Sequence, residues 1–168
     1  MGLFKKLRNK KEESVDIDYT LYSPLTGAAV PLNEVNDPVF SEEMMGKGAA
    51  VIPTVGRVVA PCNGEIITVF RTLHAITIKA DNGAEIIIHV GLETVALDGK
   101  YYEAHVSEGE RIKKGDLLLS FDLDKIKASG YDVITPVIVT NSAEYQRVEK
   151  TENSDVNEGD VLINLGNE

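Results

Sequence analysis

Histidine is the residue type in this chain that can carry nucleophilic or proton-transfer chemistry at neutral pH. The sequence contains three, His74, His89 and His105, with no tryptophan and a single cysteine, Cys62. One cysteine excludes a disulfide within the chain and a thiolate cluster for zinc. Because the unperturbed pKa of imidazole is about 6.5, much of each histidine is neutral and nucleophilic at pH 7. A reactive site is therefore expected at a histidine.

His74 and His89 lie on either side of a predicted β-hairpin. Asn82-Gly83, the most characteristic two-residue hairpin turn, separates two runs rich in β-branched residues. A two-residue turn pairs Asp81 with Ala84, and side chains alternate between the two faces of each strand. His74 and His89 are then diagonal neighbours on one face, with Cα atoms roughly 7–8 Å apart. The residues predicted on that face are Thr72, His74, Ile76, Ile87, His89 and Gly91.

Two converging imidazoles suit three kinds of chemistry. One ring can attack a phosphoryl group while the other donates a hydrogen bond to its oxygens, and Gly91, predicted opposite His74, leaves room for that group. A zinc site is a second option, but catalytic zinc usually takes three protein ligands, and His105 lies 16 residues after His89 in a different run. General acid–base catalysis needs a pocket. Spacing alone also permits two histidines that are merely packed on a sheet.

The elements that hold these histidines are predicted to be short β-strands. With 168 residues, 18.3 kDa and 43% apolar residues, the chain fits one globular domain with a sizeable core. Short helices are predicted at residues 41–45, 123–128 and 143–148. The rest is an all-β pattern of apolar runs separated by Gly, Pro, Asn and Asp. The runs are VIP (51–53), EIITVF (65–70), AITIKA (75–80), AEIIIHV (84–90), DLLLSF (116–121) and TPVIVT (135–140).

The sequence also repeats itself weakly. SPLTG (23–27) is similar to APCNGE (60–65), and VSEGERI (106–112) is similar to VNEGDVL (156–162). Repeated strand–turn units indicate an internally duplicated sandwich or barrel, in which the strands close on one another and leave little free edge.

Charge divides the chain into a basic start and an acidic body. Residues 1–11 carry five bases and no acid, while the rest carries 12 bases and 27 acids, a net charge of −15. An acidic body repels phosphate backbones, so no nucleic acid is expected as a partner. It favours encounter with a basic protein surface. No apolar run approaches the roughly 18 residues of a membrane-spanning helix, and the chain is expected to be cytoplasmic.

The N-terminal segment has two open interpretations. Leu3, Phe4 and Leu7, set among the bases, would form a short amphipathic helix able to lie on anionic lipid at the inner face of the membrane. The alternative is a solvated terminus, since about eight residues make a marginal helix in water. We expect residues 1–18 to form this basic segment and an acidic linker, and residues 19–168 to form the folded domain.

The stretch around His89 carries a specific pattern. GAEIIIHVGLETV (83–95) has glycine, two variable positions, three aliphatics, histidine, an aliphatic, glycine, an aliphatic, a variable position, threonine and an aliphatic. It resembles the active-site signature of the glucose-type enzyme IIA (EIIA) family of the bacterial phosphoenolpyruvate-dependent sugar phosphotransferase system (PTS). Other segments resemble the family in the same order: SPLTG (23–27), VFSEEMMGKGAAVIP (39–53), GRVVAPCNGEI (56–66), TLHAITI (72–78) and ITPVIVTN (134–141).

The resemblance implies a phosphocarrier with an antiparallel β-sandwich of the barrel-sandwich hybrid kind. His89 matches the histidine that accepts a phosphoryl group on Nε2 from phospho-HPr and passes it to a cysteine of a IIB domain, for coupled sugar uptake and phosphorylation. His74 matches the second histidine, which steadies the phosphoryl group and is needed for onward transfer. Thr72 matches the threonine that hydrogen-bonds the supporting ring. No metal or cofactor is implied, and family members can also regulate other proteins through the dephospho form.

Donor and acceptor must each dock on the site, so an apolar ring is expected around His89. The candidates are Val39, Phe40, Met44 or Met45, Phe70 and Ile87. Asp37 and Glu93 are expected beyond this ring, where they can meet a basic partner; Glu93 stands where the family commonly has aspartate. Each of these residues has a plainer alternative, in the core or as a solvated surface charge.

Other functions were weighed against the phosphocarrier. A zinc peptidase on a similar scaffold normally shows a His-x-His pair, which does not occur here. A biotinyl or lipoyl carrier needs a lysine at a hairpin tip, where this chain has Asn82-Gly83. A regulatory binding protein that uses the same face without passing phosphate on stays open. The chain ends at Glu168 without a IIB-like or IIC-like segment, so its partners are expected to be separate polypeptides, and Cys62 is expected to be structural.

Overall fold

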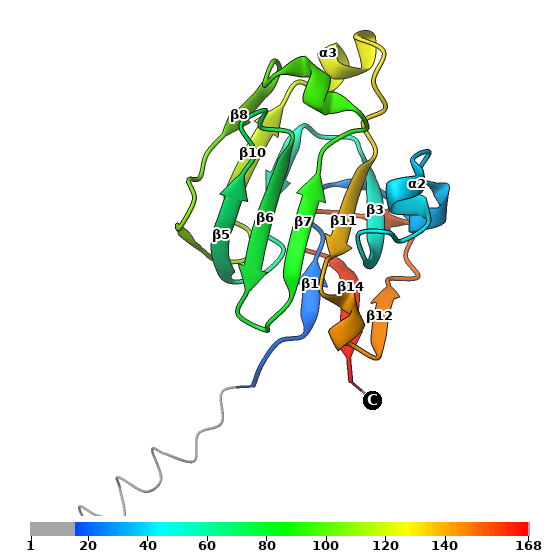
Figure 1. The fold of residues 1–168 in the computed structure, drawn as a ribbon, viewed down its shortest axis with the longest axis vertical. Helices are drawn as coiled ribbons and strands as arrows, with labels where there is room; N and C mark the ends of the chain where they lie inside the picture. The colour runs from blue at the N-terminus through cyan, green and yellow to red at the C-terminus, as the bar shows by residue number, and fades with distance from the viewer. Residues whose placement is uncertain (1–15, 168) are drawn as a thin grey trace, which may run out of the picture.

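Antiparallel strands dominate the computed structural model, which describes residues 16–167 (Figure 1). The largest sheet has eight strands in the order β13-β2-β3-β11-β7-β6-β5-β9, and two three-stranded sheets have the orders β1-β14-β12 and β4-β10-β8. The strands are β1 (Thr20–Tyr22), β2 (Gly27–Val30), β3 (Lys47–Pro53), β4 (Arg57–Val59), β5 (Gly64–Val69), β6 (Ala75–Ala80), β7 (Glu85–His89), β8 (Tyr102–Ala104), β9 (Arg111–Ile112), β10 (Leu117–Phe121), β11 (Thr135–Val139), β12 (Arg147–Lys150), β13 (Asp155–Val156) and β14 (Val161–Gly166). The predicted antiparallel β-sandwich with few helices is confirmed, and all six β-rich runs contain a strand.

The helices are short, and only one of the three predicted ones is placed correctly. Helix α3 (Leu123–Ala128) is confirmed. Helix α2 (Pro38–Ser41) begins three residues earlier than predicted, because the Asp37 side chain caps it by accepting from the Val39 N–H at 3.0 Å. The helix predicted at 143–148 is wrong, since that segment divides between a 3-10 turn and β12. The 3-10 turns are η1 (Leu32–Glu34), η2 (Thr94–Leu97) and η3 (Ser142–Glu144).

The predicted amphipathic segment at residues 1–11 lies outside the described residues. Among residues 16–167, no helix combines the length and the apolar character needed to cross a membrane.

Both faces of the eight-stranded sheet are covered around β7, which explains its three consecutive isoleucines. Ile86 and Ile88 are buried in the main core, between this sheet and the two smaller ones. Ile87 points the other way and packs in a second cluster, which includes Phe40 of α2. We call this second group the outer cluster; its buried members are Leu32, Val35, Phe40, Ala50, Ala75, Ile87, Leu92, Ile134 and Ile138.

The strand order contains the predicted duplication. Strands β4 to β10 form one continuous unit, and β1–β3 together with β11–β14 form an equivalent unit around it. When each strand is replaced by its equivalent in the other unit, the sheet order β1-β14-β12 becomes β4-β10-β8. The same replacement gives the order of the eight-stranded sheet read from its other edge. His74 and His89 both belong to the continuous unit, so the histidine pair occurs once in the duplicated fold.

Only one of the two predicted sequence repeats corresponds to this duplication. SPLTG and APCNGE are equivalent, since they lead into β2 and β5. The predicted equivalence of residues 106–112 with 156–162 is wrong, because the structural partner of 156–162 is 112–118. In these two turns the N–H of Gly115 or Gly159 donates to the first carbonyl of APCNGE or SPLTG, at 2.9 Å in both. In both turns the aspartate after the glycine also accepts a backbone bond at 2.8 Å, Asp116 from the Lys113 N–H and Asp160 from the Asn157 N–H. The acidic residue before the glycine is not shared, since Lys114 stands in the place of Glu158.

The hairpin that carries His89 has a register one residue away from the predicted one. Ala75, not Ile76, lies opposite His89. The loop has three residues instead of two: the Gly83 N–H donates to the Ala80 carbonyl at 3.0 Å, and Gly83 has a φ of 96°. A type I turn followed by a left-handed glycine is the usual three-residue hairpin loop.

The corrected register changes how the two histidines meet. Strict alternation from Ala75 would send His74 to the face opposite His89. His74, however, lies before the first residue of β6, and Leu73 has a φ of 59°. The strand geometry therefore does not extend to His74, and an irregular turn brings it to the face of His89.

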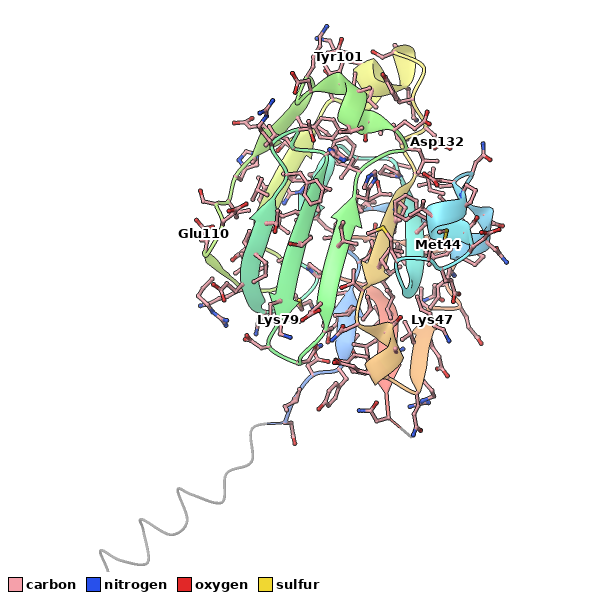
Figure 2. The ribbon with its side chains drawn as sticks, in the orientation of Figure 1. Met44, Lys47, Lys79, Tyr101, Glu110 and Asp132 are labelled. Atoms are coloured by element: carbon pink, nitrogen blue, oxygen red, sulfur yellow. The ribbon has the colours of Figure 1, made fainter. Side chains whose placement is uncertain are left out.

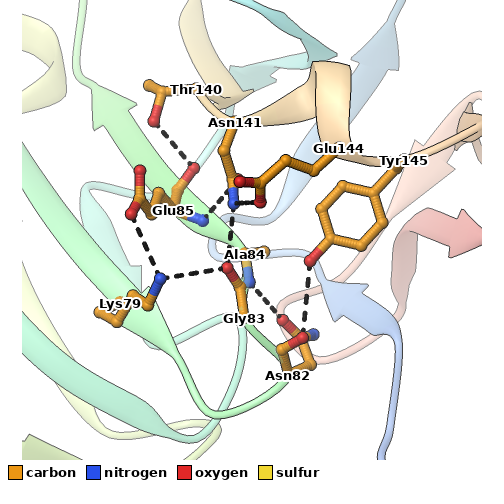
Figure 3. A network of polar contacts seen from close by, with 9 residues as sticks. All are labelled: Lys79, Asn82, Gly83, Ala84, Glu85, Thr140, Asn141, Glu144 and Tyr145. Carbon is orange, nitrogen blue, oxygen red and sulfur yellow. Dashed lines mark hydrogen bonds and ion pairs between the residues drawn. The ribbon is translucent and has the colours of Figure 1, made fainter.

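The tip of the same hairpin is fixed by residues that follow β11 (Figure 3). The Asn141 side chain accepts from the Glu85 N–H at 2.9 Å and donates to the Gly83 carbonyl at 3.0 Å. The Thr140 N–H donates to the Glu85 carbonyl at 2.8 Å. Together these bonds hold the start of β7 against β11.

The Asn141→Ala substitution is expected to lower the free energy of unfolding by about 1–2 kcal/mol, because two backbone groups of the hairpin tip lose their side-chain partner. Urea denaturation measures the change. Thr140→Val is the matched control: it removes one exposed hydrogen bond of 3.2 Å to the Glu85 carbonyl and should cost less than about 0.5 kcal/mol. Equal losses in the two variants would contradict the role of Asn141.

Candidate functional site

His74 and His89 are brought together at the end of the β6–β7 hairpin opposite its tip. His89 is the last residue of β7, and His74 immediately precedes β6. Their ring centroids are 4.8 Å apart, and the ring planes meet at 82°, an edge-to-face contact. The two rings are therefore in direct contact on one face of the sheet, as the sequence predicts.

Backbone and side-chain oxygens hold the Nδ1 atoms of both rings. Nδ1 of His89 lies 2.8 Å from the Gly91 carbonyl oxygen. Since a carbonyl only accepts, Nδ1 of His89 carries the proton and Nε2 keeps its lone pair. Nδ1 of His74 lies 2.7 Å from Oγ1 of Thr72, a hydroxyl that can donate or accept. The three predicted central residues are thus brought together, Thr72 and His74 by a hydrogen bond and His89 by its ring contact with His74.

Burial favours the neutral form of both rings. His74 is only 3% exposed, and burial, assisted by the neighbouring His89, lowers its pKa to about 4. Burial also lowers the pKa of half-buried His89, while the Gly91 carbonyl and the charge of Asp37 act in the opposite direction. A neutral ring with a free Nε2 is the nucleophilic form of histidine.

Apolar and aromatic side chains surround the pair. The Phe40 ring lies 5.1 Å from His89, and the Phe70 ring lies 5.5 Å from His74. Of the other predicted ring residues, Ile87 is buried in the outer cluster and Met45 packs against it. Val39 lies in α2 and is 39% exposed. Met44, three residues after this helix, is 68% exposed (Figure 2).

The two predicted acids differ in their relation to the histidines. Asp37 caps α2, and its charge acts on His89. Glu93 is exposed, four residues after His89, with a left-handed φ of 58°. For Glu93, as for the exposed Val39 and Met44, the structure gives no contact with the two histidines.

Gly91 has a different role from the predicted one. Its φ is 85°, and a Cβ on it would collide with the Thr94 side chain and with the Asp132 carbonyl. The glycine is therefore required by a tight turn, and not by space for a phosphoryl group near His74.

The other reactive side chains lie apart from the pair. Exposed His105 bonds to Oγ of Ser120 at 2.7 Å, on the sheet that contains β8 and β10. Within residues 16–167, no group of three His, Cys, Asp or Glu side chains is arranged to hold a metal. Cys62 is buried, and burial raises the pKa of its thiol to about 12, as a structural cysteine requires.

Sequence reasoning missed two residues next to the site. The hydroxyls of Thr94 and Tyr102 both donate to the carbonyl of Val90, between His89 and Gly91. Thr94 is the threonine of the signature-like segment 83–95. Nothing in the sequence pattern singles out Tyr102, which reaches the turn from β8.

The structure is an antiparallel β-sandwich in which two imidazole rings are in contact at one end of a hairpin. The chain belongs to the EIIA 1 family of the phosphoenolpyruvate-dependent sugar phosphotransferase system, whose model matches residues 19–145. The predicted family is thereby confirmed.

Individual relatives agree with this membership. The PTS system glucose-specific EIIA component of Bacillus cereus is 49% identical over 149 residues, which cover 89% of each chain. The PTS system beta-glucoside-specific EIIBCA component of Bacillus subtilis is 54% identical over 125 residues, 74% of this chain, and this match spans only 20% of that longer relative. The solved structure of glucose permease IIA from Mycoplasma capricolum has a TM-score of 0.82 and 34% identity, covering 88% of this chain and 96% of the other.

The lowered pKa of His74 makes a prediction about stability. The unfolded chain takes up a proton near pH 6.5 and the folded chain only near pH 4, so acid favours unfolding between these values. Replacing His74 with glutamine removes this term. Between pH 7 and pH 4.5, wild type should lose about 2 kcal/mol more unfolding free energy than His74→Gln, measured by urea denaturation. Parallel pH profiles for the two proteins would show that folding does not lower the pKa of His74.

Proposed function

We propose that this chain is a phosphocarrier that accepts a phosphoryl group from phospho-HPr on Nε2 of His89. It then passes the group to a cysteine of a separate IIB domain, for coupled sugar uptake and phosphorylation. The observation that carries the proposal is the 2.8 Å hydrogen bond from Nδ1 of His89 to the Gly91 carbonyl, which leaves the Nε2 lone pair free. Membership of the EIIA family supports it.

Positioning accounts for the first transfer. The Nε2 lone pair of His89 forms the N–P bond while the bond from phosphorus to the donor breaks. Positive charge develops on the ring as the N–P bond forms, and the Gly91 carbonyl stabilises that charge through the Nδ1 proton. In-line phosphoryl transfer needs little more than alignment and charge stabilisation.

His74 is proposed to steady the transferred group. If the Thr72 hydroxyl donates to Nδ1 of His74, the ring proton is on Nε2, and that N–H can donate to a phosphoryl oxygen. In the second transfer, the cysteine sulfur of IIB forms the S–P bond as the N–P bond of His89 breaks. His74 then keeps the departing group aligned.

The partners are proposed to dock in turn on the apolar rim of the site. Val39 and Met44 are the exposed members of this rim, while Phe40, Met45, Phe70 and Ile87 support it from below. Asp37 and Glu93 lie at its margin, in a chain whose residues after position 11 carry a net charge of −15. A basic surface on each partner would complement this charge.

We further propose that residues 19–168 form the EIIA domain and act in the cytoplasm, with residues 1–18 as a separate segment. Contact of residues 1–11 with anionic lipid, and regulation of other proteins by the dephospho form, stay predictions.

The transfer chemistry is tested by incubating the protein with phosphoenolpyruvate, enzyme I and HPr and mapping the acid-labile phosphate. His89→Gln should accept none. His74→Gln should accept phosphate but pass it to IIB about 100-fold more slowly, because it lacks the supporting donor. Thr72→Val should slow onward transfer about 10-fold. Label on any residue other than His89 would refute the proposal, and sugar uptake that survives His89→Gln would favour the purely regulatory alternative.

The docking surface is tested with Met44→Ser. Because the side chain is 68% exposed, its loss should not affect stability, but it should raise the KM for phospho-HPr about 5-fold at unchanged kcat. Val55→Ser, at a 44% exposed position between β3 and β4, is the matched control and should change neither constant. A KM unchanged by Met44→Ser would remove Met44 from the interface.

A further inference from the structure

Val90 is bonded to both halves of the histidine site. Its N–H donates to the carbonyl of His74 at 2.7 Å. Its carbonyl lies just past the end of β7 and accepts two side-chain hydroxyls, Thr94 at 2.7 Å and Tyr102 at 2.9 Å. The next residue, Gly91, provides the carbonyl that holds His89.

We propose that Thr94 and Tyr102 are positioning residues for phosphoryl transfer. By holding the Val90 carbonyl, they fix the conformation of the turn after His89. The Gly91 carbonyl of this turn in turn sets the tautomer and orientation of the His89 ring. The kinetic part of this inference rests on the function proposed above. The tautomer of His89 is a property of the free protein and can be measured without any partner.

The turn consists of two peptide planes, each held at both ends. The first plane, between Val90 and Gly91, is held by the two hydroxyls at its carbonyl and by the Ile134 carbonyl at its N–H, 3.2 Å away. The second plane, between Gly91 and Leu92, is held by His89 at its carbonyl and by the Asp132 carbonyl at its N–H, 2.9 Å away. Release of the Val90 carbonyl frees the first plane to rotate, and Gly91, which has no Cβ, resists rotation least.

The two hydroxyls belong to buried side chains. Thr94 is fully buried and Tyr102 is 8% exposed. The Thr94 side chain also packs on Gly91, because a Cβ at that glycine would overlap it. Tyr102 comes from β8 in the opposite layer, where its ring lies 6.2 Å from that of Phe121, so it anchors the turn to the main core. A buried carbonyl that loses both donors has no solvent partner and drives the turn to rearrange.

The test uses the near-isosteric double variant Thr94→Val/Tyr102→Phe in the full chain. Nitrogen-15 NMR of the imidazoles should show the single Nδ1–H tautomer of His89 in wild type and a mixture of tautomers in the variant. The kcat for phosphoryl acceptance from phospho-HPr should fall about 10-fold while KM is unchanged. Thr94→Ser, which keeps the hydroxyl, should retain the wild-type tautomer and rate. Tyr145→Phe, at the hairpin tip, should do the same.

The inference is overturned if the folded double variant keeps both the wild-type tautomer and the wild-type kcat, or if Tyr145→Phe changes them equally. If the double variant does not fold, the same spectra are recorded for the single variants. Thr94→Val is then compared with Thr94→Ser, and Tyr102→Phe is compared with Tyr145→Phe. If the wild-type protein takes no phosphate on His89, the proposed function is refuted. The tautomer spectra would still show whether Thr94 and Tyr102 position the His89 ring.

Discussion

The hydrogen bond from Nδ1 of His89 to the Gly91 carbonyl is the constraint on which the site depends. A nucleophilic ring needs its proton on one nitrogen and its lone pair on the other, and only a fixed acceptor can enforce that choice. Here the acceptor is a backbone atom two residues away, so the tautomer is a property of the turn itself. A left-handed glycine is required because any side chain at that position would meet Thr94.

Strand β11 ties this turn to the rest of the fold. Asp132 and Ile134, which lie just before its start, accept from the N–H groups of the turn after His89. Residues just after its end, Thr140 and Asn141, hold the hairpin tip at the start of β7 (Figure 3). The strand that carries the histidine is thus bonded at both ends to the same neighbour. That neighbour belongs to the other unit of the duplicated fold, so the site needs both units although its histidines come from one.

Strand positions, the two histidines that meet and their aromatic neighbours Phe40 and Phe70 could be predicted from sequence, because they follow from alternation, rare residue types and a specific local pattern. The hairpin register could not, since Asn82-Gly83 is compatible with both a two-residue and a three-residue loop, and the local sequence does not choose between them. The meeting of His74 with His89 was predicted from the wrong register, and it depends on the left-handed Leu73, which no propensity indicates. Tyr102 was missed because its contact with the turn is made from another sheet.

Burial of His74 suits the proposed function, in which the site must release the phosphoryl group that it accepts. A cationic imidazole would bind a phosphoryl group through charge-assisted hydrogen bonds, roughly twice as strong as neutral ones, and would slow its departure. With a pKa lowered to about 4, His74 is a neutral donor in the free protein. In the proposed cycle, the negative charge of a phosphoryl group on His89 raises the proton affinity of His74 only while the group is present. In that cycle, the same desolvation that favours the nucleophilic form of His89 would also keep its neighbour from trapping the phosphoryl group.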